Sequence, residues 1–328
     1  MISPSNREKE EKILSKPSKK KKGRWTKNDT ELTVMALPTT IWYILFCFLP
    51  MFGLVIAFKN YKITGGKSFI YNLFHSDWAG FKNFSFLIRS NDLFVILRNT
   101  ILYNLAFIVI NTTMQIAVAV LLTEIRNKHY RKITQSLMFL PYFISWVIVG
   151  VMAFNIFSSD YGFLNRLIET FGGTPIKFYT TPKAWPFILV FFNVWKGIGY
   201  GSVMYLAAIM GIDTSIYEAA RIDGANVFQR IFKVTIPMIM PTTIILLLLS
   251  VGGIFKGNFD MFYNLVGSNG LLYNYTDVID TLTFRALISS NDFGMSAAVG
   301  LYQSVLCFIT VVIVNKLVGL YDKDYTLF

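Results

Sequence analysis

The residues of this sequence that could do chemistry are few, and their spacing argues against catalysis. His75 and His129 lie in separate polar segments without metal-ligating neighbours, so we expect neither a metal site nor a hydrolytic arrangement. The segment 65–68, Gly-Gly-Lys-Ser, is similar to the end of a phosphate-binding loop. That loop requires a glycine five residues before Gly66, and this position is Tyr61. We therefore predict no catalytic residue, no metal ligand and no ATP site in this chain.

One polar stretch between two apolar segments has the chemistry of a contact surface for another protein. It reads Glu-Ala-Ala-Arg-Ile-Asp-Gly-Ala over 218–225 and ends at Val-Thr-Ile-Pro over 234–237. Alanine favours helix and keeps one helical face thin, so that the surface of a partner could approach closely. Asp223-Gly224 predicts a turn, because glycine accepts a positive φ without a steric penalty.

Local signals divide this stretch into two short helices. Ser215 and Glu218 have capping-box spacing for the start of the first helix, and Asn226 could cap the second. Pro237 and Pro241 predict a break in the helix where the chain enters the next apolar segment. The plainer interpretation is an ordinary interhelical loop with capping residues present by chance.

The spacing of this stretch resembles the EAA loop of permease subunits in bacterial binding-protein-dependent ABC importers. The family form is Glu-Ala-Ala, three residues, Gly, nine residues and Ile-x-Leu-Pro, and here Val234 and Ile236 replace Ile and Leu. The resemblance implies a cytoplasmic coupling helix, within a coupling loop over 211–238, that seats in a cleft on a separate ATPase subunit. The implied ATPase-coupling residues are Glu218, Ala219, Ala220, Asp223 and Gly224.

Other short motifs are similar to those of the sugar permeases in this family. Trp195-x-Gly197 resembles the Trp-x-Gly of maltose-type permeases, and Phe-Gly-Met-Ser-Ala-Ala over 293–298 resembles the opening of their last span. The basic N-terminal extension and Asp-Lys-Asp-Tyr over 322–325 resemble the polysaccharide-transport-permease branch. The resemblance covers the chain from about residue 34 to its C-terminus.

The elements around these residues are predicted to be membrane helices. The chain is 54% hydrophobic, with a mean hydropathy of +0.49, which is too apolar for an ordinary soluble protein. About 20 apolar residues in a helix cross the hydrocarbon core. We therefore predict an all-α membrane protein. The resemblance implies the type-I ABC importer permease fold, in which a permease domain over 34–328 follows a basic tail over 1–33. The six predicted spans are 34–58, 97–122, 134–157, 185–209, 239–259 and 297–320.

Basic residues predict the orientation of these spans. Residues 1–33 hold ten of the 31 Lys and Arg residues, and basic residues beside a span are retained in the cytoplasm. Counted over all loops, the excess of Lys and Arg on one side comes from this tail alone. It places both termini and the 211–238 loop in the cytoplasm. A lysine run can also bind nucleic acid, but beside a span we expect contact with membrane lipid and none with nucleic acid.

Polar residues inside the predicted spans are candidates for a transport pathway, because polar groups in hydrocarbon usually face a cavity or another helix. Aromatic rings with amide and hydroxyl groups would suit the C–H faces and hydroxyls of a sugar. Gly197, Gly199 and Gly201 could instead pack helices closely, with the aromatic residues at the interface, and both interpretations stay open. The predicted substrate-pathway residues are Asn193, Trp195, Lys196, Tyr200, Ser250 and Asn258.

Charged residues near the spans need partners if they are buried. We expect Lys196 and Lys256 to pair with an acidic group of the substrate or with Asp260, since an unpaired buried lysine would be costly. Asp277 and Asp280 are expected to be solvated loop carboxylates.

The resemblance implies that the chain is not an enzyme but a permease subunit of an ATP-driven importer in the bacterial plasma membrane. The implied substrate is a carbohydrate, such as an oligosaccharide or a glycan fragment. The implied partners are a second permease subunit in a heterodimer, two ATPase subunits and an extracellular lipid-anchored solute-binding protein. ATP and Mg²⁺ would bind to the ATPase subunits, so this chain is expected to hold no cofactor.

Two alternatives remain from the sequence. An ion-coupled secondary transporter would need acidic residues inside its spans, often with internal repeats, and the span interiors have almost no Asp or Glu. The second alternative is an ABC importer permease for a solute other than a sugar.

Overall fold

The described chain is almost entirely helical. The computed structural model describes residues 26–85, 91–322 and 326, and within them the only strand-like pairing is an isolated bridge between Lys59 and Trp78. Most of the predicted basic tail (1–25) and part of the C-terminal tail (323–325) lie outside the described residues. The chain divides into two compact units, Met1–Gly53 and Leu54–Phe328, which are described separately.

Five helices are long and apolar enough to cross a membrane. A sixth span results if the bent pair Lys128–Phe143 and Trp146–Phe157 is counted as one. The predicted all-α membrane fold is therefore confirmed. The five unbroken candidates are Lys27–Phe58, Leu93–Glu124, Pro182–Met210, Val227–Gly252 and Phe293–Leu320.

The first unit consists of the beginning of the first span. Helix α2 (Lys27–Tyr43) begins earlier than the predicted residue 34 because Thr26 and Asp29 form a capping box at its start. The Asp29 amide donates to Thr26 Oγ1 at 3.3 Å, and the Thr26 amide donates to Asp29 Oδ2 at 2.8 Å. A π-helical turn over Ile44–Phe48 and a 3₁₀ segment over Leu49–Phe58 continue the span.

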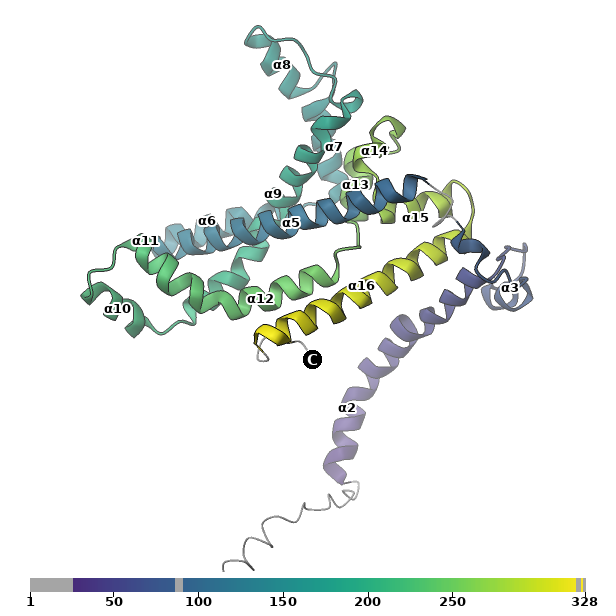
Figure 1. Cartoon of the computed structure of the whole chain (residues 1–328), viewed down its shortest axis with the longest axis horizontal. Coiled ribbons are helices and arrows are strands. Elements are labelled where there is room, and N and C mark those ends of the chain that lie inside the picture. The colour runs from purple at the N-terminus through teal and green to yellow at the C-terminus, as the bar shows by residue number, and fades with distance from the viewer. Residues whose placement is uncertain (1–25, 86–90, 323–325, 327–328) are drawn as a thin grey trace, which may run out of the picture. The chain divides into compact units, whose positions relative to one another are not determined.

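Long helices dominate the second unit (Figure 1). Helices α5 and α9 pack along each other, α6 packs on α9, and α16 packs on α12. In Figure 1, α5 extends from the end where α10 and α11 lie to the end where α15 lies. The long helices are α5 (Asn91–Glu124), α6 (Lys128–Phe143), α7 (Trp146–Phe157), α9 (Trp185–Met210), α12 (Ile236–Gly252) and α16 (Phe293–Tyr321). The shorter helices are α3 (Phe69–His75), α8 (Phe163–Thr170), α10 (Thr214–Ile222), α11 (Val227–Arg230), α13 (Phe259–Val266), α14 (Tyr273–Thr276) and α15 (Ile279–Ile288). Short 3₁₀ segments lie at Lys82–Phe84, Phe178–Thr180, Pro182–Ala184 and Gly270–Leu272, and a π-helical turn at Ile231–Thr235.

The third predicted span is not one helix, so the prediction of a continuous helix over 134–157 is wrong. Helices α6 and α7 meet at an angle of 93°. Ile144 and Ser145 have extended backbone, and the Ser145 hydroxyl accepts a hydrogen bond from the Ile148 amide. Ser145 thus caps the start of a new helix, and this cap competes with continuation of α6.

The glycines of α9 serve close packing. A Cβ atom on Gly199 would lie 1.9 Å from the Met138 carbonyl oxygen on α6, and one on Gly201 would lie 2.1 Å from Cδ of Gln115 on α5. Because either side chain would displace a neighbour, these glycines let α9 approach both helices.

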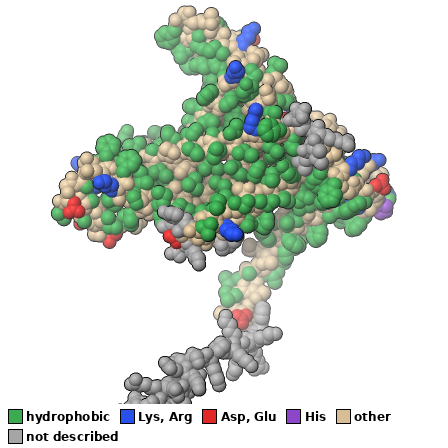
Figure 2. All heavy atoms as spheres, in the orientation of Figure 1, with side chains coloured by type: hydrophobic (Ala, Val, Ile, Leu, Met, Phe, Trp, Pro, Cys, Tyr) green, Lys and Arg blue, Asp and Glu red, His purple; other side chains and the backbone are tan. Residues whose placement is uncertain are grey.

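Two large apolar clusters, with a smaller third one around Ile96, Ile279 and Val299, fill the interior of the described second unit. The first joins α5, α7, α9 and α13 around Trp185 and Leu189, and the Trp185 indole donates to the Phe178 carbonyl at 2.9 Å. The second, around Tyr205 and Ile239, joins the end of α5 to α9 and α12. Outside these clusters, hydrophobic side chains cover much of the face visible over the long helices in Figure 2, while charged side chains gather towards its ends. This distribution suits helices surrounded by lipid or by other membrane subunits.

Candidate functional site

Helix α10 contains the Glu-Ala-Ala sequence and begins at a different cap from the predicted one. The Asp213 carboxylate accepts a hydrogen bond from the Ser215 amide at 2.9 Å, so the predicted Ser215–Glu218 capping box is wrong. A carboxylate two residues earlier is a better acceptor than the serine hydroxyl, and it also interacts favourably with the helix dipole. The Ser215 hydrogen bond lowers the pKa of Asp213.

The end of α10 is closed by a glycine turn, as the sequence predicts. Gly224 has a φ of +77°. Its amide donates to the Arg221 carbonyl at 3.1 Å, and the Ala225 amide donates to the Ala220 carbonyl at 2.9 Å. This pair of bonds is a Schellman motif, which satisfies the last carbonyls of the helix.

The second helix of the loop runs into the fifth span without a break. Asn226 caps α11 in a capping box with Gln229, which confirms the predicted cap. The π-helical turn Ile231–Thr235 then connects α11 to α12, and Pro237 lies in the first turn of α12. A π turn changes the hydrogen-bond register, and a proline is tolerated in a first turn, so the break predicted at Pro237 is absent.

The α10 loop presents apolar side chains outwards. Ile222 is 87% exposed and Phe228 is 72% exposed. On the opposite side, Tyr217 packs against the second apolar cluster, and its hydroxyl lies 3.0 Å from Thr235 Oγ1. The loop is thus anchored to the spans on one side and has an unpartnered apolar surface on the other. Of the predicted coupling residues, Glu218, Ala219, Asp223 and Gly224 are exposed and Ala220 is half-buried.

A cavity of about 690 Å³ lies between α5, α9, α12 and the junction of α6 with α7. Trp195 does not line it and instead packs against the first apolar cluster. None of the described residues that line the cavity is Asp or Glu. Five of the six predicted pathway residues line it: Asn193, Lys196, Tyr200, Ser250 and Asn258.

Sequence reasoning missed the contribution of α5 to this cavity. Asn104, Asn111 and Gln115 line it at positions i, i+7 and i+11, which place them on one face of the helix. Asn111 Nδ2 donates to Asn193 Oδ1 at 2.7 Å, while Asn111 Oδ1 is buried and has no hydrogen-bond partner among the described residues. The spacing of these amides within an apolar span is the signal that could have identified them.

The hydrogen-bond acceptors of the Lys196 ammonium lie at the bend between α6 and α7. The ammonium donates to the carbonyl oxygens of Pro141 at 3.2 Å, Tyr142 at 2.7 Å and Ile144. It also lies 5.6 Å from the centre of the Tyr142 ring and 5.4 Å from that of Trp146. Asp260 is therefore not the partner of Lys196 in the described chain, because the carbonyls at the end of α6 take its place.

Lys256 lies in a short non-helical segment, 253–258, between α12 and α13. Lys256 and Asp260 form no ion pair in the described part of the chain. The Asp280 carboxylate accepts hydrogen bonds from the Gly257 amide and, at 2.9 Å, from Gln303 Nε2. Burial raises the pKa of Asp280, while these two hydrogen bonds and the charge of Lys256 oppose the shift. Asp280 is thus half-buried and bonded, and the prediction that it is solvated is wrong.

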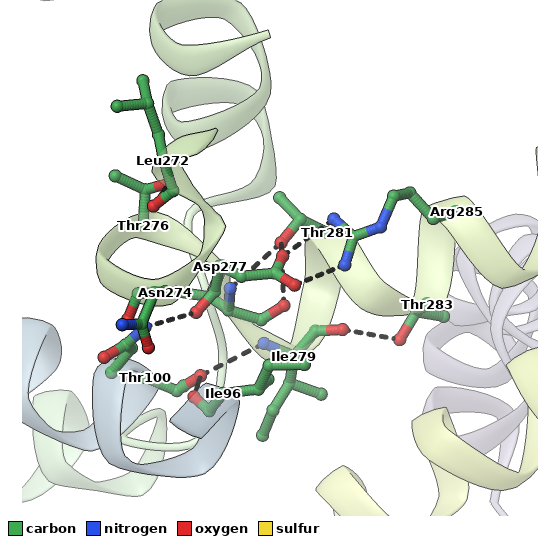
Figure 3. Close-up of polar contacts among 12 residues, drawn as sticks. Ile96, Thr100, Leu272, Asn274, Thr276, Asp277, Ile279, Thr281, Thr283 and Arg285 are labelled. Atoms are coloured by element: carbon green, nitrogen blue, oxygen red, sulfur yellow. Dashed lines mark hydrogen bonds and ion pairs between the residues drawn. The ribbon is translucent and has the colours of Figure 1, made fainter. Parts of the chain in front are cut away.

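Asp277 is also buried, contrary to expectation, and Figure 3 shows the reason. The Arg285 guanidinium pairs with its carboxylate, and the Thr281 hydroxyl donates to the same group. Asn99 on α5 donates to the Asp277 carbonyl at 3.2 Å. The network connects α15 to the beginning of α5, so the carboxylate is a structural group that the chain encloses.

The described chain thus has up to six candidate membrane spans, an open cavity with several polar lining residues, and a loop anchored to the spans. Residues 115–319 match the family described as binding-protein-dependent transport system inner membrane component. The chain is 32% identical to Protein LplB of Bacillus subtilis (strain 168), over 91% of each chain.

Two further comparisons agree. The chain is 31% identical to the polygalacturonan/rhamnogalacturonan transport system permease protein YteP of the same organism, over 89% of each chain. It also superimposes, with a TM-score of 0.78 and 31% identity, on a chain of the crystal structure of a bacterial alginate ABC transporter in complex with alginate pentasaccharide-bound periplasmic protein. That match covers 88% of this chain and 94% of the other. This chain belongs to the binding-protein-dependent permease family: it is an inner membrane permease of the sugar ABC transporters, and not an enzyme.

Proposed function

We propose that this chain forms one half of the pathway of an ATP-driven importer for oligosaccharides or glycan fragments. A second, different permease completes the pathway, two ATPase subunits bind ATP and Mg²⁺, and an extracellular lipid-anchored binding protein delivers the sugar. The chain itself holds no cofactor. Both termini and the α10 loop lie in the cytoplasm.

The observation that carries the proposal is that the same helices support both functional regions. Helices α5 and α9 line the cavity with their middle parts and α12 lines it with its C-terminal part. The second apolar cluster packs the ends of α5 and α9 and the beginning of α12 around Tyr217 of the α10 loop. A force applied to α10 therefore reaches the cavity walls through packed side chains. Glu218, Ala219, Ala220, Asp223 and Gly224 form the contact with the ATPase, together with the exposed Ile222 and Phe228.

The cavity suits a sugar better than it suits a coupling ion. Amides of α5 and α9 provide hydrogen-bonding groups for hydroxyls, and the stacked rings of Tyr142 and Tyr200, 4.3 Å apart, provide an apolar face. The lack of Asp and Glu among the described lining residues disfavours the secondary-transport alternative, which needs an acid to bind a proton or sodium ion. Two relatives belong to systems named for acidic glycans, polygalacturonan and alginate, and we propose a glycan of this kind here.

The test of ATPase coupling is the variant Gly224→Pro, because proline cannot adopt the positive φ of this residue. We expect the variant to insert in the membrane but to lose co-purification with the ATPase and ATP-dependent sugar uptake. Gly66→Pro is the matched control, since Gly66 has a similar φ of +76° and its Cβ would also meet open space. Normal uptake by Gly224→Pro would contradict the proposal.

Orientation is tested separately with a thiol at the exposed Ile222. In a Cys47→Ser background, which removes the exposed native cysteine, Ile222→Cys should react with an impermeant reagent only after the membrane is opened. Labelling of intact cells would place the α10 loop outside and would refute the proposed function.

A further inference from the structure

The two lysines that line the cavity differ in what holds their ammonium groups. Lys196 has three N–H donors and three carbonyl acceptors at the end of α6, and two aromatic rings lie beside it. Its hydrogen-bonding capacity is therefore used within the chain. It shapes the wall of the cavity and has no donor left for a substrate.

The backbone around Lys256 is fixed by three other elements. Asn104 Nδ2 on α5 donates to the Lys256 carbonyl at 2.9 Å, and Gln303 Nε2 on α16 donates to the Phe255 carbonyl at 2.7 Å. Asp280 on α15 accepts the hydrogen bond of the Gly257 amide. The Lys256 amide also donates to the Gly253 carbonyl at 2.8 Å, so this non-helical segment is held by a local turn and by contacts with three distant helices.

The Lys256 ammonium, by contrast, is available. It lines the cavity, yet among residues 26–85 and 91–322 it forms no hydrogen bond and no ion pair. Asp280 interacts with it electrostatically, but the carboxylate of Asp280 already accepts hydrogen bonds from Gly257 and Gln303. A cation with free donors, on a fixed backbone and beside a cavity without acidic lining, favours an anionic ligand.

We propose that Lys256 is the specificity-determining residue of the cavity and that it binds the carboxylate of a uronic acid unit in the sugar. This inference rests on the proposed function and adds to it the group that distinguishes acidic from neutral glycans. Asn258 also lines the cavity, and its Oδ1 accepts the Met261 amide at 3.2 Å, so we expect its Nδ2 to be the group that meets a sugar hydroxyl.

Gly257 makes this position of Lys256 achievable. A Cβ at residue 257 would lie 2.7 Å from Asp280 Oδ2 and 2.8 Å from Val278 Cγ2. Alanine at this position must therefore displace the segment or Asp280. Gly257→Ala should lower uptake of an acidic sugar even though Lys256 is unchanged, which a role of charge alone would not predict.

The experiment uses the complete transporter in proteoliposomes, with this chain, its partner permease, the ATPase and the binding protein. The probes are an oligogalacturonate trimer and the neutral galactose trimer of the same linkage. We expect Lys256→Gln to lower kcat/KM for the acidic trimer by about 10- to 100-fold, the value of a hydrogen bond between charged groups. Lys256→Arg should recover most of that loss, and neutral trimer uptake should change less than twofold. Lys183→Gln, which removes an exposed lysine outside the cavity, is the matched control.

Each result bears on one proposal. Acidic uptake by Lys256→Gln within twofold of the unmodified transporter would overturn the role of Lys256. So would an equal fall for both trimers, failure of Lys256→Arg to recover uptake, or an unmodified transporter that imports only the neutral trimer. In these cases ATP-dependent uptake of a sugar persists, so the role of the chain in an ATP-driven oligosaccharide importer stands. Import of the neutral trimer alone would also remove the proposed preference for an acidic glycan. An unmodified transporter that imports neither trimer with ATP would instead count against the proposed function itself. Recovery of the intact complex and its basal ATPase rate show that each variant is folded.

Discussion

The two ends of the second unit are built in opposite ways. The α10 loop is shaped by contacts between near neighbours in sequence: Asp213 with Ser215, Gly224 with Arg221, and Asn226 with Gln229. The opposite end depends on residues far apart in the chain. Asn99 bonds to the Asp277 carbonyl across 178 positions, and Gln303 bonds to the Phe255 carbonyl across 48.

This difference has a functional consequence. An element assembled from local contacts keeps its shape when it moves, so it can transmit a force as a unit. A region assembled from long-range contacts keeps its shape only while its helices remain in register. The cavity lies between these regions, and a relative shift of α5, α12 and α16 would alter the 253–258 segment before it altered the α10 loop.

Among the tests of this contrast, the largest effect on stability is expected from a substitution that breaks the ion pair between Asp277 and Arg285. Arg285→Gln leaves the Asp277 carboxylate buried without its cation, which costs about 3–5 kcal/mol. We expect a marked fall in the thermal unfolding temperature of the purified transporter. In the double variant Asp277→Asn with Arg285→Gln, much of the loss should be recovered because no uncompensated charge remains. A single variant as stable as the unmodified chain would show that this network does not hold this end of the unit together.

A smaller effect is expected from Lys196→Met, which keeps the apolar stem and removes the three hydrogen bonds to the end of α6. The loss should be about 2 kcal/mol, because the ammonium borders a cavity where water replaces part of what is lost. Since Lys196 positions Tyr142 beside Tyr200, the KM for the transported sugar should rise more than kcat falls. Lys196→Arg can still donate to carbonyls and should recover part of the effect. A change in kcat alone would argue against a role in shaping the wall.

The same contrast explains what the sequence could predict. The turn at Gly224 and the Asn226 cap both depend on residues within a few positions, and each is where the sequence places it. The bend at Ser145 was missed because hydropathy averages over it, although serine after a proline-containing apolar run is a local signal. The burial of Asp277 and Asp280 and the partners of Lys196 could not be predicted, because each depends on which distant helices meet.

A third test examines a purely local contact. Asn226→Ala removes the side chain that caps α11 and leaves its amide donors without an internal partner, at a cost of about 1 kcal/mol. Because α11 continues into α12, the helix should fray at its beginning while the spans keep their packing. Hydrogen exchange should become faster over 227–230 and stay unchanged over 253–258. Faster exchange in both segments would mean that the two ends of the unit are not separable.

The smallest effect on stability, but an informative one, is expected where the local and the long-range parts meet. Tyr217→Phe removes the hydroxyl 3.0 Å from Thr235 Oγ1 and keeps the ring that packs on the second apolar cluster. The stability should fall by at most about 1 kcal/mol, the value of one neutral hydrogen bond. If this bond transmits motion from α10 to the π-helical turn before α12, the amount of sugar imported per ATP hydrolysed should fall while the ATPase rate stays the same. Thr235→Val should have the same effect, and the double variant should be no worse than either single one. Additive losses in the double variant would mean that the two side chains act separately and that α10 transmits force through packing alone.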